Sequence, residues 1–241
     1  MRKGLFKGLF LLILLFSVSS LAAVDIVEMF INGGEFMYFI SFLLVVMIIL
    51  AIIKYWQLLI REKLDTKKFY LKLKGYIKNN QTEEAIRICA QFKKTTIGFI
   101  FWNGLLGYND GVKSGKKGIE LQRHLQNSFD EAGLQAIPHV EGGLFWFDII
   151  AQVSTLLGLL GTIFGLVTAF EALATAAEAD KSRLLTEGIS MAMGTTAYGL
   201  SVAIPTMLIK GALQARADKI VNDIDEYSVK TINQITYAMK E

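Results

Sequence analysis

Residues 149–170, IIAQVSTLLGLLGTIFGLVTAF, contain no charged side chain in 22 positions. At about 1.5 Å of rise per residue, a helix of this length spans roughly 33 Å, enough to cross a hydrocarbon core of about 30 Å. Two more stretches are uncharged: FMYFISFLLVVMIILAII at residues 36–53 and GISMAMGTTAYGLSVAIPTMLI at residues 188–209. The pattern predicts an all-α integral membrane protein with three transmembrane helices, the alternative being a soluble bundle of buried helices.

The charges beside these stretches predict an orientation. Residues 24–35 carry acids and no base, whereas basic residues follow the first span. These basic residues are Lys54, Arg61, Lys63, Lys67, Lys68 and Lys72. The positive-inside rule places them in the cytoplasm. We therefore expect a helical cytoplasmic domain at residues 54–148, a periplasmic loop at residues 171–187, and a cytoplasmic amphipathic helix with the C-terminus at residues 210–241.

The first 23 residues have the layout of a secretory signal peptide, with a basic start, an apolar run and small residues at the end. We expect cleavage, which would leave residues 24–35 as a periplasmic N-terminus; an uncleaved membrane anchor is the alternative. The net charge is +3, and Arg2, Lys3 and Lys7 lie in this leader, so a processed chain would be neutral. Nucleic acid is therefore not an expected partner.

Within the predicted cytoplasmic domain, apolar spacing indicates helices on both sides of a break at residues 79–80 and over residues 119–129. Thr82 is the predicted N-cap of the helix after the break, because Glu83 and Glu84 would follow in its first turn. The glycines of this domain are interpreted as connectors between helices. They are Gly104, Gly107, Gly111, Gly115 and Gly118.

Small residues recur at helical spacing on the second and third spans. They include Gly158, Gly161 and Gly165 on the second span and Gly199 on the third. In lipid, small faces let helix backbones approach closely, so we predict that these two helices pack tightly. Pro205 removes a backbone donor and is expected to bend the third helix.

The second and third spans contain no Asp, Glu, Lys, Arg or His. A transporter that moves protons by titration needs a protonatable group at membrane depth, and this chain does not supply one there. Thr162 and Thr196 each lie eight residues inside the outer end of their span, about 12 Å deep, and could form one polar layer. In the alternative interpretation, each hydroxyl bonds its own i−4 carbonyl and serves packing only.

Groups suited to catalysis are few. Cys89 is the single cysteine, which excludes an internal disulfide, a cysteine-based zinc site and an iron–sulfur cluster. The two histidines, His124 and His139, are too far apart in sequence for a helical metal-ligand pair. We therefore predict no enzymatic activity, no metal and no cofactor.

Two sequence blocks resemble the MotA/TolQ/ExbB proton-channel family. The first is LGLLGTIFG at residues 157–165, followed by Ala169 and Phe170, and the second is residues 188–205, ending in TTAYGLSVAIP. The resemblance implies an ExbB/TolQ-like subunit of a pentamer-like homo-oligomer in the bacterial inner membrane. Its second and third helices would line a central pore.

The resemblance also implies partners. A single-span protein of the ExbD/TolR type would occupy the pore and supply the missing aspartate. Proton passage would then drive a TonB- or TolA-like protein, with H⁺ as the transported ion and Na⁺ left open. The pore threonines of the family correspond to Thr162 and Thr196. Met191 stands where many members have a glutamate, with Glu187 one turn away.

Other functions stay open at this point. Within the channel class they are a Tol-type role in envelope integrity and a gliding or flagellar stator. A non-conducting membrane scaffold would use the same small faces. A transporter acting alone through Glu171 or Glu187 would have to conduct without any partner.

Overall fold

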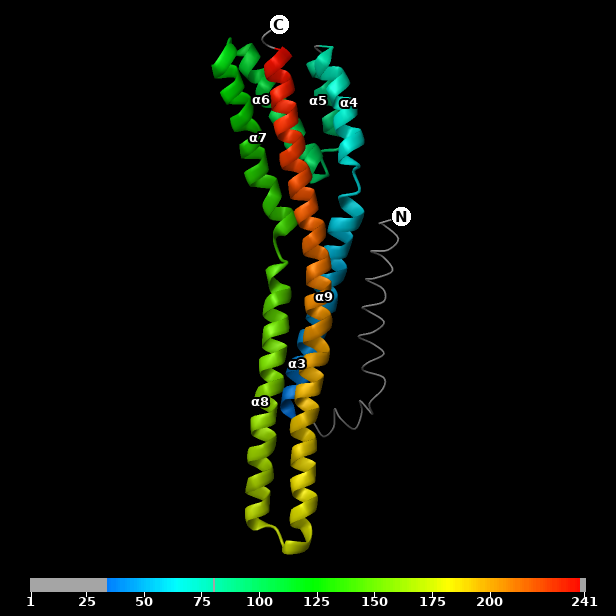
Figure 1. Cartoon of the computed structure of the whole chain (residues 1–241), viewed down its shortest axis with the longest axis vertical. Helices are drawn as coiled ribbons and strands as arrows, with labels where there is room; N and C mark the ends of the chain where they lie inside the picture. The colour runs from blue at the N-terminus through cyan, green and yellow to red at the C-terminus, as the bar shows by residue number, and fades with distance from the viewer. Residues whose placement is uncertain (1–33, 80, 239–241) are drawn as a thin grey trace. The chain divides into compact units, whose positions relative to one another are not determined.

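The computed structural model describes residues 34–79 and 81–238, and every regular element within these ranges is helical (Figure 1). The elements are α3 (Glu35–Tyr55), the π-helical segment η1 (Trp56–Arg61), α4 (Thr66–Lys78), α5 (Thr82–Gln91), α6 (Thr96–Lys113), α7 (Gly118–Glu141), α8 (Phe145–Thr175) and α9 (Glu178–Ala238). The all-α prediction is confirmed. The predicted signal peptide and nearly all of the predicted periplasmic N-terminus lie outside the described residues.

Three helical segments are long and apolar enough to cross a membrane, as predicted. They contain the three uncharged stretches: α3 covers residues 36–53, α8 covers residues 149–170, and α9 covers residues 188–209. The chain divides into two compact units. We call them the apolar unit, which has residues 34–53 and 143–213, and the polar unit, which has residues 54–79, 81–142 and 214–238.

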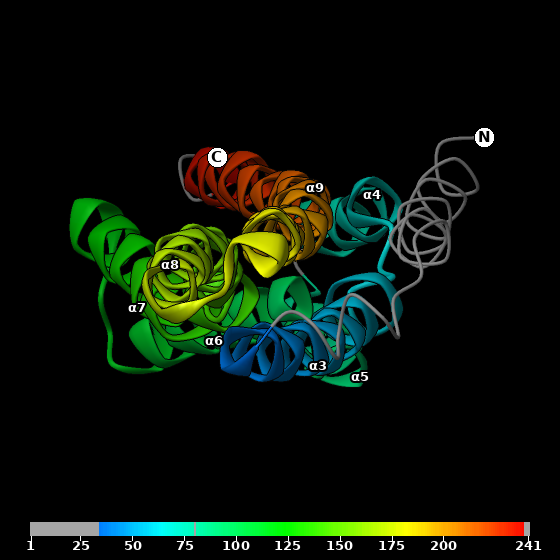
Figure 2. The ribbon, with the colours of Figure 1, turned by 90° about the horizontal axis from the view of Figure 1, so that it is seen from below.

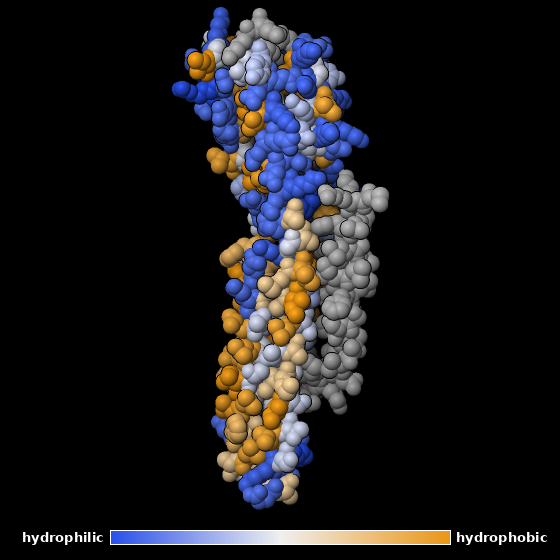
Figure 3. Space-filling view, in the orientation of Figure 1, coloured by the Kyte–Doolittle hydropathy of each residue, from blue (hydrophilic) through white to orange (hydrophobic). Residues whose placement is uncertain are grey.

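The apolar unit consists of α3, α8 and the part of α9 up to Leu213. A cluster of Met37 and Ile40 from α3 with Tyr198 and Val202 from α9 holds these helices together. Hydrophobic side chains dominate the visible surface of this unit, over α8 and its part of α9, whereas hydrophilic ones dominate the polar unit (Figure 3). Large exposed apolar side chains of this kind suit contact with lipid or with another membrane helix.

The segment 171–187, predicted to be a loop, is almost wholly helical. Helix α8 continues to Thr175 and α9 begins at Glu178, so only residues 176–177 connect them. Glu178 and Asp180 lie in the first turn of α9, where negative charge stabilises the helix dipole. The charged residues that indicated a loop are therefore exposed side chains on helix ends.

Helix α9 is one continuous element of 61 residues and passes through Pro205 without a break. Pro205 is buried, and the hydroxyl of the neighbouring Thr206 donates to the carbonyl of Val202 at 2.7 Å. The described part of the amphipathic tail predicted at residues 210–241, residues 210–238, is consequently the end of α9 rather than a separate helix. Its apolar stripe includes the buried residues Leu213, Ala217 and Ile220.

The polar unit has an aromatic core. The ring of Phe101 from α6 packs edge-on against Phe69 of α4 at 5.8 Å and Phe129 of α7 at 5.4 Å between centroids. Helix α5 begins at Thr82, whose N-cap residue is Gln81 and makes no side-chain cap bond. The prediction of Thr82 as the N-cap was therefore wrong by one residue, because the chain already enters helical geometry at Thr82.

Three of the five glycines predicted as connectors lie inside α6 instead. A Cβ atom on Gly104 would come within 2.4 Å of the Phe129 ring, and one on Gly107 within 2.0 Å of the Ser128 hydroxyl. Gly111 similarly faces α7. Their role is thus to let α6 approach α7. Only Gly115 and Gly118, with φ of +77° and +54°, serve the turn between these helices.

Candidate functional site

Helices α8 and α9 lie side by side and touch through their backbones (Figures 1 and 2). A Cβ atom on Gly158 would lie 3.1 Å from the carbonyl oxygen of Thr195 and 3.2 Å from the Cα of Thr196. A Cβ atom on Gly199 would lie 2.6 Å from the carbonyl oxygen of Ser154. Because backbone atoms cannot rotate away as a side chain can, Gly199 leaves no space for a Cβ atom, and Gly158 leaves very little.

The same contact continues along the helix pair. A Cβ atom on Gly161 would lie 2.6 Å from the Thr195 hydroxyl, and one on Gly165 would lie 3.0 Å from the Cβ of Ala192. Gly188 extends the contact toward the start of α9, where its Cβ would approach Ala169 to 2.2 Å. The glycines predicted for close packing thus all lie in one interface.

Thr196 forms a hydrogen bond across this interface. Its hydroxyl donates to the carbonyl of Gly158 at 2.8 Å, and its side chain is half-buried. The absence of a side chain at Gly158 exposes that carbonyl to the other helix. The interpretation in which this hydroxyl bonds its own helix therefore fails for Thr196.

Thr162 behaves differently. Its hydroxyl donates to the carbonyl of Leu159 in its own helix at 2.6 Å, an i−3 bond, and its side chain is half-buried. The two predicted site threonines therefore have separate hydrogen-bond partners within one chain. A donor bond to a carbonyl leaves both lone pairs of each hydroxyl oxygen available to accept another proton donor.

Two further hydroxyls lie inside the interface. Thr195 is 1% exposed and donates to the carbonyl of Ala192 at 2.9 Å. Ser154 is fully buried, and its hydroxyl has no hydrogen-bond partner among the residues that the structure describes. Ser154 precedes Gly158 by one helical turn on the small face, which is the signal that could have identified it from sequence.

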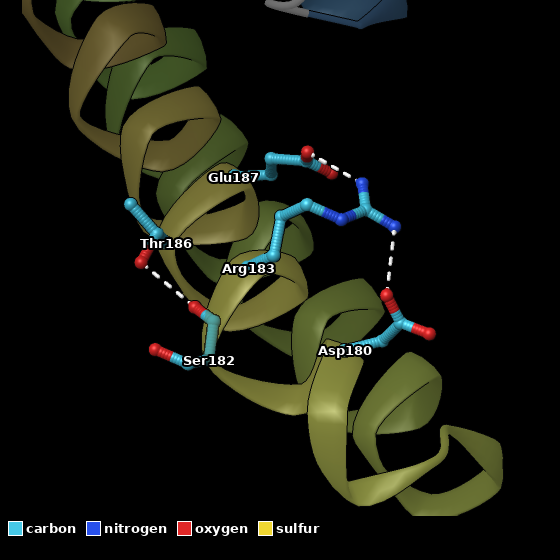
Figure 4. Close-up of polar contacts among 5 residues, drawn as sticks. All are labelled: Asp180, Ser182, Arg183, Thr186 and Glu187. Carbon is cyan, nitrogen blue, oxygen red and sulfur yellow. Dashed lines mark hydrogen bonds and ion pairs between the residues drawn. The ribbon is translucent and has the colours of Figure 1, made fainter.

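The carboxylates near the span ends are exposed or ion-paired. At the start of α9, Arg183 lies 2.8 Å from Glu187 and 3.6 Å from Asp180 (Figure 4). The hydrogen bond and charge of Glu187 raise the pKa of Arg183. Asp148 at the start of α8 pairs with Lys210 of α9 at 3.3 Å. Glu187 is therefore part of an exposed ion-pair group.

The thiol of Cys89 is buried in the polar unit, and burial raises its pKa to about 12. A thiol in this environment is a packing group rather than a nucleophile. Among the described residues, no group of three or more His, Cys, Asp and Glu side chains could hold a metal ion.

Comparison with known proteins gives a family match and several relatives. The MotA/TolQ/ExbB proton channel family matches residues 93–226. Biopolymer transport protein exbB1 of Vibrio cholerae is 34% identical over 115 residues, which cover 48% of this chain and 44% of the relative. A putative biopolymer transport protein ExbB homolog from Methanothermobacter thermautotrophicus is 24% identical over 214 residues, which cover 89% of this chain and 71% of the relative. The Tol-Pal system protein TolQ of Haemophilus influenzae is 34% identical over 96 residues, which cover 38% of this chain and 42% of the relative.

Proposed function

The chain belongs to the MotA/TolQ/ExbB proton channel family, and on that premise we propose that it is the channel-forming subunit of an inner-membrane, proton-driven energiser of the ExbB/TolQ type. The family is a transport and channel family, not an enzyme family. One observation carries the proposal. Helices α8 and α9 contact each other through backbone at Gly158 and Gly199 and carry threonine hydroxyls, yet neither residues 149–170 nor residues 188–209 contain Asp, Glu, Lys, Arg or His.

A proton path through this pair needs a group that binds and releases a proton. A carboxyl group at membrane depth does this, and its ionised form is costly in lipid, so it requires polar neighbours. We assign that group to a partner of the ExbD/TolR type with a single span and an aspartate. The match of the family model to α8 and α9 supports such a partner.

Thr162 and Thr196 are the residues assigned to the path. Each hydroxyl hydrogen points to a backbone carbonyl, so each oxygen accepts from a protonated carboxyl group or a water molecule. Thr162 and Thr196 would thus favour the proton-carrying state of the partner beside them. Close approach of α8 and α9 depends on four glycines, Gly158, Gly161, Gly165 and Gly199. Pro205 of α9 is buried and is assigned a packing role as well.

The assembly is proposed to be a homo-oligomer with about five copies, as the family resemblance implies. Exposed apolar side chains of α8, such as Leu159, Ile163 and Val167, suit contact with lipid or a neighbouring copy. Proton flow would move the partner and pass force to a TonB-like protein for outer-membrane transport. A Tol-type role in envelope integrity and a gliding or flagellar stator are the alternatives in the same class.

A non-conducting scaffold is the second candidate, and the own-helix bonds of Thr162 and Thr195 favour it, since such bonds serve packing. Native mass spectrometry of the tagged chain, extracted gently from its own membrane, identifies the partner. We expect about five copies together with a single-span protein that has an intramembrane aspartate. Recovery of the chain alone would contradict the proposal.

The complex from that experiment would then be placed in liposomes under an imposed proton gradient, with a pH-sensitive dye inside. A channel acidifies the interior, and a scaffold does not. Liposomes with this chain alone are the control, because residues 149–170 and 188–209 contain no Asp, Glu, Lys, Arg or His, which predicts no flux without the partner. Flux from the chain alone would favour a path through Glu171 or Glu187.

A further inference from the structure

The polar unit contains a cavity of about 360 Å³ that the proposed function does not use. Its walls come from η1, from the turn that leads into α6, and from the end of α7. The lining residues that matter here are Gln57, Arg61, Lys93, Lys94, Gln135 and His139. The volume falls at the lower end of the range for small-ligand sites, about 300 to 1,000 Å³.

The charge of the lining is positive. Three cations, Arg61, Lys93 and Lys94, face one acid, Glu62. Glu62 is buried, and its carboxylate accepts bonds from the backbone N–H of Thr96 at 3.0 and 3.1 Å and from the Thr96 hydroxyl at 2.8 Å. This carboxylate therefore anchors the start of α6. The Lys93 ammonium lies 5.5 Å from the centroid of the Trp102 ring, and among the described residues no carboxylate forms an ion pair with Arg61, Lys93 or Lys94.

Two contacts hold the cavity in shape. The Nε of Arg61 donates to the carbonyl of Lys94 at 3.1 Å, and this bond anchors the guanidinium. Its two terminal NH₂ groups make no hydrogen bond to a described residue. The Gln57 side chain donates to the carbonyl of His139 at 2.7 Å and so joins η1 to α7. A guanidinium that lines the same cavity as two lysine side chains suits the oxygens of a phosphate.

The position in the chain favours a phospholipid as the source of that phosphate. Gln57 follows Ile53, the last residue of the first predicted span, by four positions, so the chain allows at most about 14 Å between them. The polar headgroup layer begins at the edge of the hydrocarbon core. The geometry points to a site in this cavity for the phosphate group of an anionic phospholipid headgroup. This assignment is independent of the proposed channel function.

The test uses the full chain, delipidated in detergent and titrated with dioleoyl phosphatidylglycerol at fixed ionic strength. Native mass spectrometry counts the bound lipid. The double variant Lys93→Gln/Lys94→Gln removes two cavity cations, and both side chains are exposed, so the fold stays intact. The matched control is Lys113→Gln/Lys117→Gln, which removes two exposed cations outside the cavity.

We expect the cavity variant to bind phosphatidylglycerol about 10- to 30-fold more weakly than the unmodified chain, and the control variant to change by less than about 2-fold. Dioleoyl phosphatidylcholine and inorganic phosphate provide the other two arms, and both should bind more weakly than phosphatidylglycerol. Equal losses in the two variants, or no loss, would overturn the site. Inorganic phosphate that binds as tightly and with the same dependence on Lys93 and Lys94 would overturn the lipid assignment.

Discussion

Glycines allow close approach in two helix pairs, α6–α7 and α8–α9, but the atoms that contact these glycines differ between the pairs. In the polar unit, Gly104, Gly107 and Gly111 of α6 face side chains of α7, such as the ring of Phe129 against Gly104. In the apolar unit, Gly158 and Gly199 face backbone atoms of the other helix, such as the Ser154 carbonyl against Gly199, whereas Gly161 faces the Thr195 hydroxyl. The first pair buries a large side chain, and the second brings two main chains together.

The difference follows from the solvent of each unit. In water, burial of a phenyl ring is strongly favourable, so a glycine that accepts one contributes to the core. In lipid, burial of apolar surface gains little, and association depends on close packing and on hydrogen bonds between helices. The backbone contact also exposes the Gly158 carbonyl, which makes the bond from Thr196 possible. Close packing and polarity are therefore coupled in the apolar unit.

The largest expected effect concerns the access of water to a thiol in each of the two units. Burial raises the pKa of the Cys89 thiol to about 12, so at pH 8 only about one thiol in 10⁴ is ionised. A thiol introduced by Thr196→Cys with Cys89→Ala should lie on a hydrated path and react with a small maleimide at least about 10²-fold faster than Cys89. Mass spectrometry of the assembled complex measures both rates.

The unmodified chain is the reference for that experiment, since it contains only Cys89. Equal, slow labelling of both thiols would mean that Thr196 is as dry as the core of the polar unit. That result would show that water has no better access to the α8–α9 interface than to the buried core of the polar unit.

Gly199→Ala should cost about 2 to 3 kcal/mol of stability, because its Cβ would meet the Ser154 carbonyl at 2.6 Å and force the helices apart. Thermal unfolding in detergent, followed by circular dichroism, measures the loss. Ser154→Gly should not restore stability, since the obstructing atom belongs to the main chain. A variant as stable as the unmodified chain would show that the backbones are not in contact.

Gly104→Ala in the polar unit should cost less, about 1 to 2 kcal/mol, because the obstacle at 2.4 Å is the Phe129 ring. Here a second substitution should help. In a Phe129→Leu background, the added cost of Gly104→Ala should fall below about 0.5 kcal/mol, which a double-mutant cycle detects. Additive losses of stability would mean that the Phe129 ring is not the obstacle at Gly104, and the contrast with Gly199 would then fail.

Thr196→Val should lower stability by about 0.5 to 1 kcal/mol, since it removes a bond between helices. Thr162→Val should change it by less, because the Thr162 bond stays within α8. Thr196→Ser keeps the hydroxyl and is the control. Equal effects of the two valine substitutions on unfolding would contradict the distinction between a bond across the pair and a bond within one helix.

The spans and their small faces could be predicted because length, absence of charge and helical spacing are properties of one segment. The role of Gly104 could not, since glycine serves both turns and close packing, and only the partner Phe129 decides between them. The charges near Glu178 indicated a loop, yet negative charge in a first helical turn stabilises α9. Local composition does not separate these cases.

The sequence predicted candidate site residues but not their hydrogen bonds. Spacing placed Thr162 and Thr196 at one depth, while the acceptor of the Thr196 hydroxyl depends on the register of α8 against α9. That register is set by which glycine faces which backbone atom, as with Gly158 and Thr195. The unpartnered hydroxyl of Ser154 likewise emerges only from the packed pair.

The most direct test of the account is proton flux in liposomes that contain the chain with its single-span partner, compared among Thr162→Val, Thr196→Val and Thr196→Ser. The account predicts that both valine variants lose at least about 10-fold of the flux, as expected for a lost polar contact of about 1.4 kcal/mol or more in the path, while the serine variant keeps most of it. Full flux from both valine variants would show that the hydroxyls serve packing alone and would contradict the channel role assigned to them.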